Sequence, residues 1–294
     1  MHLCYIAYVT NQTPSPVLRF APSPNGYLHL GHAYSALLNA QVARELDGCL
    51  LLRIEDIDIT RCRPGYETAL REDLAWLGLE WEEPVRRQSE HFDDYTKALG
   101  RLRALDLLYR SYASRKEIAA AVASRDWPRD PDGAPLYPRE ALRAIDDPAI
   151  HAEDEPFSLR LDMGKALALV PPLSWQELQP DLTGIEAVPA ELARWGDVIL
   201  ARKEFPSSYH LAVVCDDALQ GVSHVVRGHD MFQATAVHRL LQQLFGLPQP
   251  VYRHHALVLG EEGEKLSKSL ASKSLRALRA EGMTPADVRK LVGM

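Results

Sequence analysis

Two histidines stand three residues apart in the segment PSPNGYLHLGH, residues 22–32. On a helical turn, side chains at this spacing project from one face, so His29 and His32 can meet the same anion. Gly31 between them permits close approach, and a helix N-terminus adds unpaired N–H groups and a positive dipole. The segment therefore predicts a nucleotide phosphate site, although an isolated H-x-G-H string more simply caps or packs a helix.

Two lysines, Lys265 and Lys268, occur in the segment KLSKS at residues 265–269, directly after the polar stretch GEEGE at 260–264. A polar, glycine-containing stretch of this kind suits a mobile loop. Lysines that close over a triphosphate would neutralise the charge that develops on phosphoryl oxygens during nucleotidyl transfer. Taken alone, the segment is an ordinary exposed basic loop.

Strand and helix patterns alternate around the histidine segment. Residues 17–21 and 49–54 are short apolar runs typical of strands, and 31–46 and 65–79 carry apolar residues at helical period. Such alternation favours a doubly wound parallel sheet, in which ligands lie beyond the carboxyl ends of the strands. The histidine segment follows the first strand, at such an end.

The rest of the chain predicts an interruption and then a return to the sheet. Proline, aspartate and glycine accumulate at 127–138 and again around 171–180, which indicates an insertion. We expect helices at 91–109 and 232–245, and strands at 197–201, 211–215, 222–226 and 256–259.

Composition excludes several classes of protein. The chain has 294 residues, a net charge of -7 and a pI of about 5.9, which argues against a uniformly basic nucleic-acid coat. Four scattered cysteines form no metal-ligand pair or disulfide framework, as expected in a reducing compartment. Without a signal segment or an apolar run of about 20 residues, we expect a cytoplasmic protein with no membrane partner.

Together, the H-x-G-H after the first strand and the later K-L-S-K-S resemble the paired signatures of class I aminoacyl-tRNA synthetases. The flanking segments RFAPSP at 19–24, LRIEDID at 52–58 and VRGHD at 226–230 resemble the glutamyl-specific branch. The resemblance runs from about Val17 to Ser269. It implies an α/β fold, a Rossmann-type doubly wound parallel sheet, with an inserted subdomain and a short C-terminal helical stem-contact region.

The resemblance also implies a division of the chain. The expected parts are a leader (1–16), the first half of the Rossmann core (17–108), an inserted acceptor-binding-like subdomain (109–195), the second half of the core (196–259), and the lysine loop with the helical stem-contact region (260–294).

Residue by residue, the family pattern implies a glutamate site of Arg19, Ala21, Ser23, Glu55, Tyr209 and Arg227. It further implies that ATP, with Mg²⁺, is bound by His29, Gly31, His32 and Lys268, and that His29, His32, Lys265 and Lys268 are catalytic. The chemistry is reasonable, because arginine forks match carboxylates and Glu55 can receive the ammonium group. Outside the family context, Arg19 would be a surface residue at a strand edge and Tyr209 a core residue.

One departure from the family concerns zinc. Many relatives carry a zinc site in the insertion, made from two cysteines one residue apart, a tyrosine and a third cysteine. The matching positions here are Ser111, Ala113, Tyr137 and Ala141, which lack the thiolate ligands of a tetrahedral site. We predict no zinc, and expect packing around tyrosines such as Tyr109, Tyr112 and Tyr137 to stabilise the insertion.

The chain ends shortly after the lysine segment, where full glutamyl-tRNA synthetases continue into an anticodon-reading region. The resemblance is therefore strongest to truncated relatives, and implies a monomer that activates L-glutamate with ATP and transfers it to the queuosine base in the anticodon loop of tRNA(Asp). Three alternatives stay open: a minimal tRNA(Glu) charger, a glutaminyl enzyme, and a catalytically silent tRNA-binding paralogue. Ala21-Pro22-Ser23 argues against the glutaminyl enzyme, whose relatives usually carry Pro-Pro-Glu there.

Overall fold

The computed structural model describes residues 15–123, 126–256 and 273–294. Three parallel strands form the first half of a central sheet, in the order β1-β2-β3. Their bounds are Val17–Phe20 for β1, Cys49–Ile54 for β2 and Glu82–Arg87 for β3, with helices α1 (Leu30–Glu45) and α2 (Pro64–Trp76) in the connections.

The second half of the sheet has the order β7-β6-β10-β9. Strands β6 (Ser174–Leu178), β10 (Val251–His255) and β9 (His224–Gly228) are parallel, and β7 (Ile185–Pro189) pairs antiparallel to β6 at the edge. The two halves meet at β1 and β9, where the Ser223 N–H donates to the Val17 carbonyl at 3.0 Å. The strands of the two halves therefore extend to opposite sides of the β1–β9 junction.

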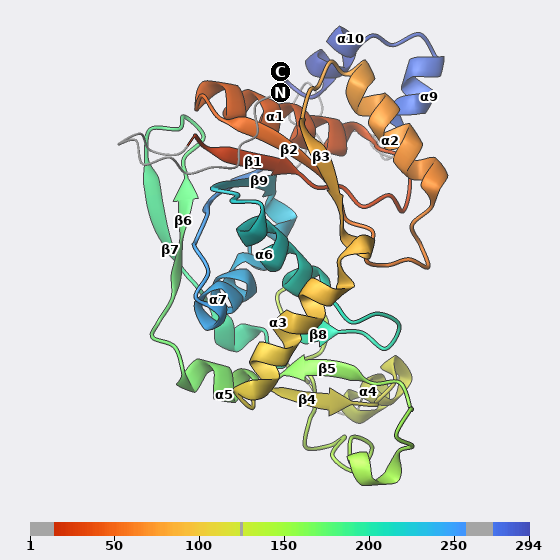
Figure 1. Cartoon of the computed structure of the whole chain (residues 1–294), viewed down its shortest axis with the longest axis vertical. Helices are drawn as coiled ribbons and strands as arrows, with labels where there is room; N and C mark the ends of the chain where they lie inside the picture. Colours follow the sequence, from red (N-terminus) through yellow and green to blue (C-terminus); the bar gives the residue numbers. More distant parts are fainter. Residues whose placement is uncertain (1–14, 124–125, 257–272) are drawn as a thin grey trace.

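Helices cover the sheet on both faces (Figure 1). Helices α1 and α2, with α9 (Leu275–Ala280) and α10 (Pro285–Leu291), share one apolar cluster, while α3 (Phe92–Ala104), α6 (Tyr209–Leu219) and α7 (Thr235–Phe245) share another. Strand β2 contributes to both clusters, because Leu50 and Leu52 belong to the first and Leu51 packs against the second. This alternation is the period-two geometry of a strand covered on both faces.

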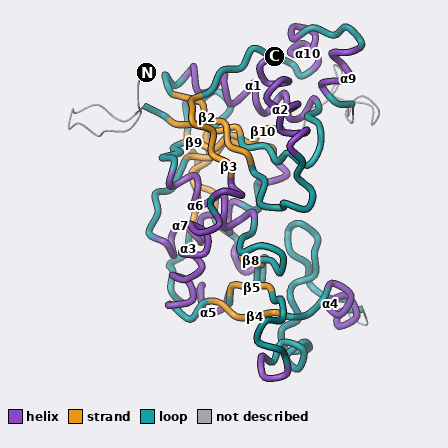
Figure 2. The backbone as a smooth tube through the Cα atoms, turned by 45° about the vertical axis from the view of Figure 1, so that its right-hand side comes forward, coloured by secondary structure: helices purple, strands orange, loops and turns teal. Residues whose placement is uncertain are grey.

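An antiparallel sheet of β4 (Leu108–Ser111), β5 (Ser158–Leu161) and β8 (Ile199–Ala201) lies apart from the central sheet, at the lower end of Figures 1 and 2. Helices α4 (Arg115–Val122) and α5 (Met163–Ala168) follow β4 and β5 in this part of the chain. Short 3-10 helices occur in the connections, and are η1 (Gln88–Glu90), η2 (Pro148–Ile150), η3 (Leu192–Arg194) and η4 (His229–Met231). Among the described helices, none combines the length and apolar character needed to cross a bilayer.

Several sequence predictions of local structure are confirmed. The expected strands at 17–21, 49–54 and 222–226 correspond to β1, β2 and β9, and that at 197–201 overlaps β8. The expected helices at 31–46, 65–79 and 232–245 correspond to α1, α2 and α7. The parallel pairing of β1 with β2 and of β9 with β10 confirms the predicted α/β fold.

The predicted strand at 211–215 is wrong, because these residues lie within α6. The Ser208 hydroxyl accepts the Leu211 N–H at 3.4 Å and so caps the helix, which continues to Leu219. Leu211, Ala212, Val213 and Val214 are all buried, since α6 packs between β8 and the helices α3 and α7. A short apolar run that is buried on every side shows no helical period in the sequence.

Two other boundaries differ from prediction. The helix expected at 91–109 ends at Ala104, because Asp106 adopts a φ of 57° and the chain turns into β4. The strand expected at 256–259 is not confirmed: β10 is Val251–His255, and Ala256 already lies after it. The sequence of β10, Val-Tyr-Arg-His-His, lacks the apolar pattern of a strand, because its polar side chains are partly or fully buried. Residues 257–259 lie outside the described residues.

Candidate active site

A cavity of about 520 Å³ opens at the carboxyl ends of β1 and β9, where the two halves of the sheet diverge. In doubly wound sheets this switch point is where ligands bind. The structure brings nine of the residues singled out in the sequence to its wall: Arg19, Ala21, Ser23, His29, Gly31, His32, Glu55, Tyr209 and Arg227. Lys265 and Lys268 lie outside the described residues.

The two histidines form the N-terminus of α1. The His29 Nδ1 accepts the Gly31 N–H at 3.2 Å, and the His32 Nδ1 accepts the His29 N–H at 3.2 Å. Burial lowers the pKa of His29, and burial together with His29 lowers the pKa of His32 to about 4. Both imidazoles are therefore neutral near pH 7 and carry their proton on Nε2, where it is a hydrogen-bond donor.

Gly31 has a steric role at this helix start. A Cβ added to it would lie 3.1 Å from the Cε1 atom of the His29 ring. A side chain at position 31 would therefore displace the His29 ring from its capping position.

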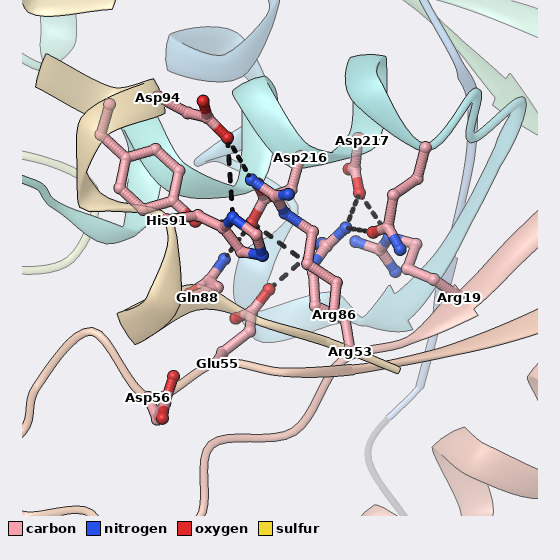
Figure 3. A network of polar contacts seen from close by, with 12 residues as sticks. Arg19, Arg53, Glu55, Asp56, Arg86, Gln88, His91, Asp94, Asp216 and Asp217 are labelled. Carbon is pink, nitrogen blue, oxygen red and sulfur yellow. Dashed lines mark hydrogen bonds and ion pairs between the residues drawn. The ribbon is translucent and has the colours of Figure 1, made fainter. Parts of the chain in front are cut away.

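Arg19 is buried, with an exposure of 4%, because β1 lies between β2 and β9 rather than at an open edge. Its Nε donates to the Asp217 Oδ1 at 3.1 Å (Figure 3). Its terminal guanidinium nitrogens have no hydrogen-bond partner within residues 15–123, 126–256 and 273–294. Arg19 thus offers a free, charged fork beside the cavity.

Glu55, directly after β2, is held by Arg53 two residues earlier. The Arg53 Nη2 donates to the Glu55 Oε1 at 3.2 Å, and the Arg53 Nη1 lies 2.8 Å from the Asp217 Oδ1. Burial raises the pKa of the Glu55 carboxyl, while the guanidinium groups of Arg53 and Arg19 oppose the rise. A half-buried carboxylate at the cavity wall is well suited to receive an ammonium group.

The Asp216 side chain next to this pair was not predicted. It is fully buried and accepts hydrogen bonds from Arg86 (2.8 Å), Gln88 (2.8 Å) and Tyr95 (2.9 Å). These partners tie β3, η1 and α3 to α6, as Figure 3 shows around Asp216. The only signal in the sequence is the pair Asp216-Asp217 inside an apolar run, which the strand prediction obscured.

Of the remaining predicted residues, Ala21 and Ser23 lie in the loop after β1, Tyr209 begins α6 and Arg227 lies on β9. Ala21 and Ser23 line the cavity, and the Ser23 Oγ is 3.6 Å from the Cys62 Sγ. The Tyr209 hydroxyl is 3.3 Å from an Arg227 Nη atom, and burial raises its pKa. Sequence reasoning missed several lining residues, which are Phe20, Pro22, Ser35, Val226, Gly228, Asp230, Met231 and His255.

A second, smaller cavity of about 180 Å³ adjoins the first. The two share Ser23, Glu55 and Tyr209 as walls. The other residues of the second cavity are mostly polar or charged, and are Asn25, Ile57, Asp58, Arg61, Gln88, Arg202 and Phe205. Ser23, Glu55 and Tyr209 therefore face two adjoining cavities.

The four positions that match the family's zinc ligands do not fit a metal. The Ser111 hydroxyl donates to the Tyr137 hydroxyl at 2.7 Å, which in turn donates to the Asp146 Oδ2 at 2.5 Å. Ala113 has no ligating atom and is buried beside Tyr137. Within the described residues, no group of three or more His, Cys, Asp or Glu side chains is placed to share a metal ion.

Known proteins resemble this chain over most of its length. Residues 17–293 match the family model of the catalytic domain of class I tRNA synthetases (E and Q). The chain is 43% identical over 286 residues to the glutamyl-Q tRNA(Asp) synthetase of Rhodobacter capsulatus, covering 95% of this chain and 100% of that protein. It is 38% identical to a glutamate–tRNA ligase of Methylobacterium sp. over 284 residues, covering 94% of this chain and 59% of the ligase.

The crystal structure of a glutamate tRNA ligase from Elizabethkingia meningosepticum, in complex with its amino acid, superimposes with a TM-score of 0.67 at 27% identity. The match covers 92% of this chain and 53% of that one, so the chain spans little more than half of the length of such ligases. The resemblance found in the sequence is confirmed, and the chain belongs to the class I tRNA synthetase family of the glutamyl and glutaminyl branch.

Proposed function

We propose that this protein activates L-glutamate with ATP and Mg²⁺ and transfers the glutamyl group to the queuosine base in the anticodon loop of tRNA(Asp). One observation carries the activation step: residues of β1, α1, α6 and β9 that suit glutamate and phosphate line one cavity at the switch point of the sheet, together with Glu55 directly after β2. The acceptor is supported by the relative from Rhodobacter capsulatus, whose whole length the chain matches.

In the activation step, a glutamate carboxylate oxygen attacks the α-phosphorus of ATP, and the bond to pyrophosphate breaks. We assign the free fork of Arg19 to a carboxylate of glutamate and Glu55 to its ammonium group. Their contacts orient the amino acid toward the nucleotide, which removes much of the entropic barrier to reaction.

We assign the His29 and His32 imidazoles to the phosphates of ATP. Because both rings are neutral with the proton on Nε2, they donate hydrogen bonds and bring no positive charge. The cationic stabilisation of the leaving pyrophosphate then falls to Lys265 and Lys268, as the family pattern implies, and to Mg²⁺ bound with ATP.

In the transfer step, a hydroxyl of the acceptor attacks the carbonyl carbon of the glutamyl-adenylate, and AMP leaves. The acceptor must reach that carbon while the nucleotide occupies the main cavity. We infer that the acceptor approaches through the second cavity, because that cavity shares Ser23, Glu55 and Tyr209 with the main cavity.

A minimal tRNA(Glu) charger is the second candidate, favoured by the 38% identity to the Methylobacterium ligase. The two candidates share the first step and differ only in the acceptor.

The deciding experiment supplies labelled glutamate and ATP to purified tRNA(Asp) with and without queuosine, and to tRNA(Glu). We expect label only on tRNA(Asp) that contains queuosine. Label on tRNA(Glu) would establish the second candidate. In parallel, pyrophosphate exchange that depends on glutamine rather than glutamate would support a glutaminyl enzyme, and tRNA binding without any exchange would support a silent paralogue.

A further inference from the structure

Arg227 is surrounded by hydrogen-bond acceptors on every side. Its Nε donates to the His254 Nε2 at 3.1 Å. One Nη contacts the Thr235 hydroxyl at 2.6 Å and the Met231 carbonyl at 3.2 Å, and the other contacts the His238 Nδ1 at 3.1 Å and the Tyr209 hydroxyl at 3.3 Å. A guanidinium group has five N–H donors, so these acceptors engage all of them.

The hydrogen-bond directions set the proton positions on the histidines. Because Arg227 can only donate, His238 accepts at Nδ1 and carries its proton on Nε2, which faces the His210 Nδ1 at 3.2 Å. His254 likewise accepts at Nε2, and its Nδ1 proton faces the Glu177 carboxylate at 2.9 Å. Burial and Arg227 together hold the pKa of His238 well below its ordinary value, consistent with a neutral ring.

These acceptors differ in their access to the cavity. Thr235 and His238 are buried, with exposures of 0% and 2%, and neither they nor His254 line the cavity. Tyr209 and Met231 do line it, and the contact to the Tyr209 hydroxyl is the longest of the five. The Arg227 N–H directed at Tyr209 is therefore the one that an incoming carboxylate can take over most easily.

We propose that Thr235, His238 and His254 are positioning residues that hold the Arg227 guanidinium with one exchangeable N–H toward the substrate. Arg227 then supplies a fixed charge and a single hydrogen bond, in contrast to Arg19, whose terminal nitrogens form a free fork. This inference rests on the proposed function, since the carboxylate concerned is that of glutamate.

Two matched pairs of variants test the inference. Thr235→Val removes the acceptor but keeps the shape of the side chain, whereas Thr235→Ser keeps the hydroxyl. His238→Leu removes the Nδ1 acceptor, whereas His238→Asn can place its Oδ1 at the same position. His224→Leu is the control, because His224 lies on β9 with Arg227 and its ring bonds to Ser223 instead.

The readout is the KM for glutamate and for ATP, with kcat, in glutamate-dependent pyrophosphate exchange. We expect Thr235→Val and His238→Leu to raise the KM for glutamate about tenfold or more, with the KM for ATP unchanged. Thr235→Ser, His238→Asn and His224→Leu should stay within about threefold of wild type.

The outcomes separate the positioning inference from the proposed function. Wild-type exchange with an unchanged KM for glutamate in both Thr235→Val and His238→Leu would overturn the positioning role and leave the proposed function intact. Equal losses in Thr235→Val and Thr235→Ser would also overturn it, because the hydroxyl would then not matter. A wild-type protein without glutamate-dependent exchange would overturn both.

Discussion

His29 and His32 bond through Nδ1 to backbone N–H groups at the start of α1, which leaves Nε2 as the donor toward the cavity. Their capping role and their proposed phosphate contacts are therefore compatible, since each uses a different ring nitrogen. The sequence alone presented these two roles as alternatives.

The low pKa of His32 makes a prediction about stability and pH. A folded-state pKa of about 4, against 6.5 for the free side chain, means that the unfolded chain binds the proton more readily. The His32 contribution to the free energy of unfolding is thus fully present above pH 6.5 and is lost as the pH falls toward 4. Between pH 7 and 5, we expect wild type to lose about 1–2 kcal/mol more than His32→Gln.

Urea unfolding of both proteins at pH 7 and pH 5 measures this difference. Identical pH dependence of wild type and His32→Gln would show that His32 titrates normally in the folded protein.

Asp217 and its neighbour Asp216 allow a second prediction. Asp217 contacts Arg19 and Arg53, whereas Asp216 contacts Arg86, Gln88 and Tyr95. Each substitution to Asn leaves buried arginine without its full counter-charge and should lower the free energy of unfolding by about 3 kcal/mol. Only Asp217→Asn should also raise the KM for glutamate, by about tenfold, because Arg19 loses its orientation.

Pyrophosphate exchange and urea unfolding together separate these effects. Asp94→Asn is the surface control, since Asp94 pairs with Arg86 at a side-chain exposure of 39% and should cost less than about 1 kcal/mol. A raised KM for glutamate in Asp216→Asn, equal to that in Asp217→Asn, would mean that the whole network acts as one unit.

At the scale of elements, α6 places three kinds of residue at once. Its first residue, Tyr209, lines the cavity, its middle is apolar core, and its Asp216 and Asp217 neutralise arginines of β1, β2 and β3. The helix thus joins the second half of the chain to the strands of the first half.

Within the segment predicted to be an insertion, a hydrogen-bonded network lies at the positions that the resemblance matches to zinc ligands. Asp146 accepts from the Tyr137 hydroxyl and from the Tyr112 N–H, and Arg160 lies 3.6 Å over the Tyr137 ring. The packing of tyrosines expected from the sequence is therefore accompanied by a half-buried carboxylate.

We predict that Tyr137→Phe lowers the free energy of unfolding by about 1–3 kcal/mol, because it leaves Ser111 and Asp146 without their shared partner. A chelator should leave the Tm of wild type unchanged. Tyr109→Phe is a comparison variant, because the Tyr109 hydroxyl bonds to Asp197 outside this network. Stoichiometric zinc in the purified protein, or a Tm lowered by chelator, would contradict the prediction.

At the scale of the whole molecule, the proposed site lies between two halves of a sheet that meet at β1 and β9. Arg19 and Glu55 come from the first half, and Tyr209 and Arg227 from the second. A ligand that spans the junction therefore contacts both halves and should stabilise them together.

A non-hydrolysable glutamyl-adenylate analogue at about one hundred times its Kd should raise the free energy of unfolding by about 2.7 kcal/mol. The glutaminyl analogue at the same concentration should stabilise less, because it lacks a carboxylate for the arginines. Chemical unfolding with each analogue measures both values. Equal stabilisation by the two analogues would count against selection of glutamate by charge.

The protein is acidic overall but buries several positive charges. The chain has a net charge of -7, yet Arg19, Arg53 and Arg227 are each less than a tenth exposed. Burying these groups requires paired carboxylates or neutral acceptors, and the structure uses carboxylates for the first two and imidazoles with a hydroxyl for the third.

The sequence by itself determined the parallel α/β fold and the family, because strand and helix periods and the two signature segments are local patterns. It also singled out nine residues that the structure gathers at one cavity, although their binding roles stay predictions. Short-range patterns suffice for this much because each depends on residues close together in the chain.

Only the tertiary structure decided that 211–215 is helical, that Arg19 is buried, and that Arg227 is enclosed by Thr235, His238 and His254. The contact of Arg19 with Asp217 joins residues 198 positions apart. No periodicity or composition encodes such a pairing, because buried polar residues interrupt the apolar pattern and their partners come from distant elements. The physical requirement that a buried charge be neutralised or hydrogen-bonded becomes visible only once the chain is folded.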